Sequence, residues 1–133
     1  MTTTAELLLA RADALLDSPD GAAVGHSARL AAFLARQAVE ELIDVRCAML
    51  CGGQTVVAKQ KAKLAVLKSL DTTPAGGVLI DAWHQLSGFC HQHAYQLSPT
   101  VGEVRVLCAA VRQACFSEVR SGPRPVAGDT AST

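Results

Sequence analysis

The chain has 133 residues, of which half are apolar and only 4% are aromatic. This length fits a single domain that can bury a core without disulfide bonds or a metal. Twelve basic residues balance twelve acidic ones, so no overall basic charge draws the chain to nucleic acid or to an anionic membrane, and any such binding requires a local patch.

The apolar residues are mainly Ala, Leu and Val, and because Ala and Leu strongly favour helix, the composition predicts an all-α fold. Five cysteines are an odd number, which argues against a closed set of disulfides. The N-terminal sequence lacks the basic region of a signal peptide, and no window approaches the roughly 18 uninterrupted apolar residues of a membrane span. We therefore expect a soluble cytoplasmic protein with free thiols, no membrane association, no metal site and no cofactor.

The first two predicted helices lie over about residues 5–16 and 27–50. Thr3 and Glu6 form a capping box before the first, and a Gly-Gly pair after the second suits a left-handed helix cap. In the second helix apolar side chains recur at intervals of three and four, which predicts its buried face. They are Leu30, Phe33, Leu34, Ala38, Leu42, Ile43 and Met49.

Three more helices are predicted in the second half of the chain. A short, lysine-rich one lies over about 59–70, and a longer one over about 78–96. The apolar face of the longer helix comprises Val78, Leu79, Ala82, Trp83, Leu86, Phe89, Cys90, His93 and Leu97. A second capping box, Thr100 and Glu103, begins the last helix. That helix is expected to bury Val104, Leu107, Cys108, Val111 and Cys115.

Four amphipathic helices can bury their apolar stripes only against one another. The sequence therefore predicts one domain over residues 1–120, an up-and-down four-helix bundle with one short additional connecting helix. Residues 121–133 show no apolar periodicity, which predicts a disordered C-terminal tail.

The order of these elements resembles the HEPN superfamily of helical domains. The resemblance rests on LLLARADALLD followed by HSARLAAFLARQAVEELID, on the connector AKLAVLKSL, and on WHQLSGFCHQHAYQLSPT followed by EVRVLCAAV. Together these segments span about residues 5–118, and they are most similar to a small actinobacterial branch of the superfamily. The resemblance implies a HEPN-like bundle that pairs into a homodimer.

Many HEPN proteins are metal-independent ribonucleases whose motif is an Arg, four to six residues, then a His, with both motifs of a dimer facing one cleft. An Arg can steady a phosphate, and a His can move the proton of a ribose hydroxyl. The resemblance makes His91 and His93 the candidate motif histidines. The positions where the Arg would stand hold other residues, namely His84, Gln85, Leu86, Ser87 and Gly88.

Other chemistry-bearing residues lie on the long second helix and beside the histidines. Arg36 and Glu40 are four apart and can pair. If their side of the helix faces the bundle, they can join His91, His93 or Tyr95 in a polar network; the alternative is a solvated face. Arg36 or Arg105 is also the candidate replacement for the missing motif Arg.

Two further groups of residues are candidates for a binding or a reactive site. Lys59, Lys61, Lys63 and Lys68 are the one concentration of cations and can bind phosphate backbones, although a solubilising surface is the simpler interpretation. Cys90, His91 and His93 lack the paired spacing of zinc sites, and Cys90 lacks a partner from a separate element, so we interpret Cys90, Cys108 and Cys115 as core residues.

Because the motif Arg is absent, we expect a non-catalytic, homodimeric binding or accessory module in an RNA-, nucleotide- or defence- and repair-related system. The candidate ligands are RNA or a nucleotide, and a partner protein encoded nearby is a further candidate. Two alternatives stay open: a toxin-like, metal-independent endoribonuclease with a rearranged Arg/His site, and a helical bundle that binds a small ligand.

Overall fold

A computed structural model describes residues 3–17, 24–54, 56–91 and 99–116, and over these ranges the chain forms helices and turns without a strand. The helices are α1 (Thr4–Leu16), α2 (Val24–Leu50), α3 (Gln60–Leu70), α4 (Pro74–Cys90) and α5 (Val101–Phe116). The all-α prediction is therefore confirmed for these residues. The expected tail at 121–133 lies outside them.

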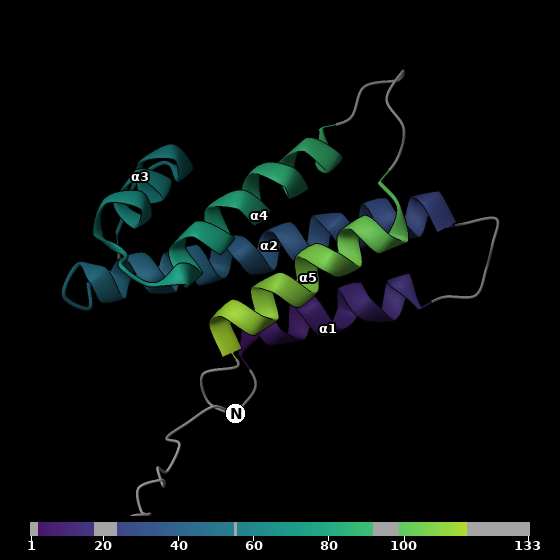
Figure 1. The fold of residues 1–133 in the computed structure, drawn as a ribbon, viewed down its shortest axis with the longest axis horizontal. Helices are drawn as coiled ribbons and strands as arrows, with labels where there is room; N and C mark the ends of the chain where they lie inside the picture. The colour runs from purple at the N-terminus through teal and green to yellow at the C-terminus, as the bar shows by residue number, and fades with distance from the viewer. Residues whose placement is uncertain (1–2, 18–23, 55, 92–98, 117–133) are drawn as a thin grey trace, which may run out of the picture.

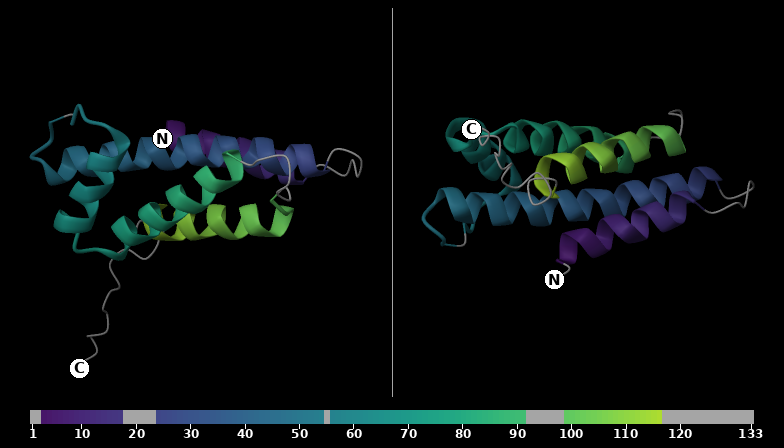
Figure 2. Two further views of the ribbon diagram at one scale, coloured as in Figure 1. Left: turned by 90° about the horizontal axis from the view of Figure 1, so that it is seen from above. Right: turned by 60° about the horizontal axis from the view of Figure 1, so that its bottom comes forward.

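Helix α2 is the longest and contacts all four other helices. Helix α1 runs along one side of its first half, α4 and α5 lie on another side, and α3 crosses its C-terminal end (Figures 1 and 2). The middle of α2 and the C-terminal half of α4, which carry the candidate site residues, are thus packed against each other.

Thr3 and Thr100 cap their helices as predicted, and the capping box of Thr100 and Glu103 is complete. The Thr3 hydroxyl accepts a hydrogen bond from the Glu6 backbone N–H at 3.1 Å. At the start of α5 the Glu103 N–H donates to the Thr100 Oγ1 at 3.0 Å, and the Thr100 N–H donates to Glu103 Oε1 at 2.8 Å. These bonds satisfy backbone donors that the first turn of a helix leaves without partners, which explains why both helices begin where they do.

The predicted buried face of α2 is wrong in part. Leu30, Phe33 and Met49 are 41%, 46% and 65% exposed, respectively. The buried face is instead made largely of small residues: Ala28, Ala31, Ala32, Ala35, Ala38, Val39, Ile43 and Cys47. The distance between packed helix axes depends on the side chains at the contact, so these small residues let α1 and α4 approach α2 closely.

Helix α4 differs from its predicted bounds at both ends. It begins at Pro74 rather than near Val78, because proline fits the first helical turn, where its missing N–H costs nothing. It ends at Cys90, so His91 lies in the turn that follows rather than inside the helix. Residues 92–98, which include His93 and Tyr95, lie outside the described residues.

The connection between α3 and α4 is held by a nearly buried ion pair. Arg46 Nε donates to Asp71 Oδ2 at 2.7 Å, and the Asp71 side chain is 1% exposed. Asp71 Oδ1 also accepts from the Thr73 N–H at 2.9 Å, as an N-terminal residue of a turn commonly does. A Cβ at Gly76 would lie 2.9 Å from the Asp71 side chain, so this contact requires glycine.

We predict that this ion pair makes folding stability depend on pH in the acidic range. The hydrogen bond from Arg46 is the main cause that lowers the pKa of Asp71 from 3.8 to about 2. A carboxyl with a lowered folded-state pKa stabilises the fold above its unfolded pKa and loses this effect as pH falls through the folded pKa.

In urea unfolding, Asp71→Asn is expected to cost about 2 kcal/mol at neutral pH. The gap between the variant and the wild type should shrink as pH falls from about 4 to about 2. The exposed Asp81, changed to Asn, is the matched control and should cost little. A gap that stays constant over this pH range would contradict the assignment.

Candidate functional site

The candidate site is a polar cluster between α2 and the C-terminal end of α4, which we call the Arg36 cluster. It comprises Arg36 and Glu40 from α2, with Trp83, Cys90 and His91 from α4 and the turn after it. Arg36 and Glu40 are one turn apart and therefore lie on the same side of α2. Trp83 lies on α4, and His91 is the residue that directly follows this helix.

The Glu40 carboxylate forms a side-chain hydrogen bond between α2 and α4. Its Oε2 accepts from Arg36 Nε at 3.1 Å and from Trp83 Nε1 at 2.9 Å. The Arg36 guanidinium lies 5.6 Å from the centroid of the Trp83 ring, a distance at which a cation is attracted to an aromatic face. The Arg36 and Glu40 side chains are 22% and 36% exposed, so the cluster is accessible from solvent.

Arg36 also reaches the candidate motif histidine. Its Nη1 lies 3.4 Å from His91 Nε2. Because a guanidinium only donates, this hydrogen bond requires Nε2 to accept, which is the neutral tautomer with its proton on Nδ1. Arg36 therefore contacts a carboxylate and an imidazole at once.

The Cys90 thiol also belongs to the cluster, because Arg36 forms a hydrogen bond with it. Burial raises the pKa of Cys90, and a hydrogen bond from Arg36 opposes that shift. A thiol with a raised pKa stays protonated near neutral pH, so this group is poorly suited to nucleophilic attack. Cys90 also lines a groove of about 230 Å³ with Arg29, Leu30 and Phe33, which we call the Phe33 groove.

The sequence-predicted residues are brought together only in part. The Arg36–Glu40 pair forms as predicted and meets His91; His93 and Tyr95 lie outside the described residues. Arg105, the other candidate replacement, instead donates to the Leu16 carbonyl at 3.2 Å and pairs with Asp17 at the end of α1.

The lysines lie on α3 and at the residue before it. Lys63 Nζ pairs with Asp44 at 2.7 Å, and Asp44 is two turns beyond Arg36, a rise of about 12 Å. Lys59 and Lys61 are exposed at the start of α3. This patch is therefore a separate feature from the Arg36 cluster, and one of its charges is already paired.

Sequence reasoning assigned Trp83 to the core and missed its polar contact. The available signal was that an indole N–H needs a hydrogen-bond partner when its ring is buried. Trp83 is the single tryptophan of the chain, and among the acidic residues it is Glu40 that meets it.

Within the described ranges no three His, Cys, Asp or Glu side chains converge as a metal site would require. All five cysteines belong to the described residues and none is in a disulfide, and Cys47 and Cys108 are buried. Burial is the main cause that raises the pKa of Cys108 to about 11. These two thiols pack as small core side chains.

Comparison with protein-family models, with curated proteins and with solved structures finds no match to this chain. Among the described helices none is long and apolar enough to cross a membrane.

We predict that Trp83 and Arg36 stabilise the fold through the shared Glu40 oxygen. Trp83→Phe keeps an aromatic ring but removes the Nε1 donor, and it should cost about 1 kcal/mol in urea unfolding followed by circular dichroism. In a protein that already carries Glu40→Gln, Trp83→Phe should lower the free energy of unfolding by clearly less. The indole then loses a hydrogen bond to a neutral acceptor rather than to a carboxylate. Equal costs in both backgrounds would show that the negative charge of Glu40 does not strengthen this bond, which would contradict the prediction.

Proposed function

We propose that this chain is a HEPN-like four-helix bundle that acts as a homodimeric module and binds RNA or a nucleotide through a phosphate at the Arg36 cluster, without cleaving it. The observation that carries the proposal is the contact of Arg36 with His91 at an accessible junction of two helices. Arginine suits phosphate because its planar donors match the geometry of the oxygens.

The geometry also indicates how a phosphate would enter. Glu40 holds the Nε edge of Arg36, while Nη1 points to His91 across 3.4 Å, a long hydrogen bond. A phosphate oxygen that inserts between Nη1 and His91 would accept a charge-assisted bond from Arg36 and leave the Glu40 contact in place. Once the imidazole proton moves from Nδ1 to Nε2, His91 would donate a second bond to the same phosphate. The Trp83 ring, lying against the guanidinium, restricts its movement.

Glu40 supports a binding role over a catalytic one. Its charge offsets that of Arg36, which lowers the positive potential available to stabilise charge that develops in a transition state. His91 Nε2 is engaged by Arg36, so it is not available to take a proton from a ribose hydroxyl. Glu40 also weakens the attraction of a bound phosphate, but recognition of a phosphate needs no proton transfer and can use the planar donors of Arg36.

The Phe33 groove supports the homodimer. Leu30 and Phe33 are 41% and 46% exposed on α2, and the groove shares Cys90 with the Arg36 cluster. Pairing two copies across this surface would bury these apolar side chains and bring two Arg36 clusters to one cleft. This is the arrangement that the HEPN resemblance implies.

The endoribonuclease remains the second candidate, favoured by the same Arg36–His91 contact. Incubation of total RNA with the protein in EDTA separates the two functions. Cleavage by the wild type that is lost in both His91→Ala and Arg36→Gln would establish the nuclease and overturn the binding-only proposal. His93→Ala, examined in parallel, tests the second candidate histidine.

Binding itself should be visible in fluorescence anisotropy of a labelled, short single-stranded RNA at low salt. We expect Arg36→Gln and His91→Ala each to weaken binding about tenfold, since a hydrogen bond to a charged group is worth about 1.5–3 kcal/mol. Arg11→Gln, an exposed arginine on α1, is the matched control and should change affinity little. Equal affinity in all four proteins, or no binding by any, would contradict the proposal.

The homodimer predicts a specific response to a charge in the Phe33 groove. Phe33→Asp should convert a dimer into a monomer in size-exclusion chromatography with light scattering, because a buried unpaired carboxylate opposes association. Val106→Asp is the control, since Val106 on α5 is also exposed, at 67%, but does not line the groove. A monomeric wild type at micromolar concentration would contradict the dimer.

A further inference from the structure

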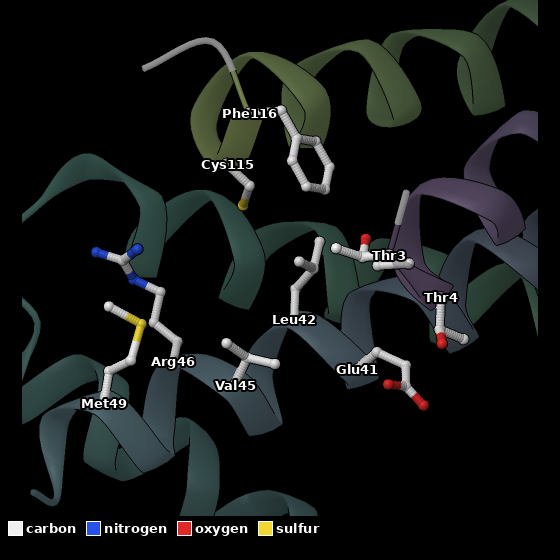
Figure 3. A pocket seen from close by; sticks show the side chains of 10 residues that line it. Thr3, Thr4, Glu41, Leu42, Val45, Arg46, Met49, Cys115 and Phe116 are labelled. Carbon is white, nitrogen blue, oxygen red and sulfur yellow. The ribbon is translucent and has the colours of Figure 1, made fainter. Parts of the chain in front are cut away.

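A second and larger concavity lies apart from the Arg36 cluster. It has a volume of about 470 Å³ and is formed where the first turn of α1, the second half of α2 and the last turn of α5 meet (Figure 3). Its apolar wall comprises Leu42, Val45, Met49, Cys115 and Phe116. We call it the Leu42 groove.

The groove exists because α2 is much longer than α1. The first turn of α1 lies beside Glu41 and Leu42, and α2 continues to Leu50, about 12 Å beyond Leu42. Leu42, Val45 and Met49 recur at three and four on this uncovered stretch and form one stripe. Val45 and Met49 are 56% and 65% exposed, respectively, which is costly for side chains that gain from burial.

The charges around the Leu42 groove are not balanced. Arg46 lines it, but its charge is compensated by the nearly buried Asp71 carboxylate at 2.7 Å. The positive end of α1 is capped by Thr3 and offset by Glu6 in its first turn. Glu41 also lines the groove and is exposed, and no residue of the described ranges forms a hydrogen bond or an ion pair with its carboxylate.

We propose that the Leu42 groove binds a small, compact apolar molecule that carries an amine, with the apolar body against Leu42, Val45 and Phe116 and the ammonium group at Glu41. The volume lies within the range of small-molecule sites, which are mostly apolar with few polar groups that fix orientation. Because the groove is open on one side, the dissociation constant is expected on the order of 0.1–1 mM.

Three probes with one rigid apolar cage test the charge preference: 1-adamantylamine, 1-adamantanol and 1-adamantanecarboxylate. Titration of the full chain at low salt, followed by NMR chemical shifts, should show the amine binding about threefold more tightly than the alcohol, as an exposed ion pair implies. The carboxylate should bind most weakly. Shifts should concentrate at Val45, Met49 and Phe116.

Glu41→Gln should reduce the affinity for the amine to that for the alcohol and leave the alcohol unchanged. Met49→Gln should weaken all three probes, and Asp81→Asn, an exposed carboxylate on α4, should weaken none. Arg36→Gln should also have no effect, which separates this site from the phosphate site. Absence of binding by all three probes, or an amine preference that survives Glu41→Gln, would overturn the proposal.

Discussion

Close packing against the alanine-rich face of α2 is the constraint on which the rest of the structure depends. Ala28, Ala31, Ala35 and Ala38 are buried with at most 1% exposure, and they leave room for α1 and α4 to approach the same helix from two sides. A larger side chain at these positions would have to move a helix, since packed interiors have few voids. The alanine face fixes how α2 is rotated about its own axis, and this rotation decides where its polar side chains point.

The orientation places Arg36, Glu40 and Asp44 on a stripe with a spacing of four residues, next to α4 and α3. Arg36 and Glu40 meet the end of α4, whereas Asp44 meets Lys63 on α3. Because α2 buries its alanine face, Phe33 is exposed to solvent beside the Arg36 cluster, and Val45 is exposed near α1. The packing of the alanine face therefore leaves two apolar surfaces of α2 exposed.

The sequence predicts the helices far better than it predicts which faces are buried. The caps at Thr3 and Thr100 follow from local patterns, and both threonine hydroxyls accept from the predicted backbone N–H. On α2 the spacing of the large apolar residues predicts one buried face, but the alanines form most of the face that is buried. Which residues are buried depends on how closely the neighbouring helices pack as well as on hydrophobicity. The Arg36–Glu40 pair follows from spacing, whereas its contacts with Trp83 and His91 span 43 and 55 residues and depend on the packing of α4 on α2.

The most direct test of the account is the tautomer of the His91 side chain, read from its imidazole ¹⁵N chemical shifts above neutral pH. The account predicts that the proton lies on Nδ1 in the wild type, because Nε2 accepts from Arg36, and that Arg36→Gln changes this pattern. A proton on Nε2 in the wild type, or identical spectra for both proteins, would show that α2 and α4 do not form one site.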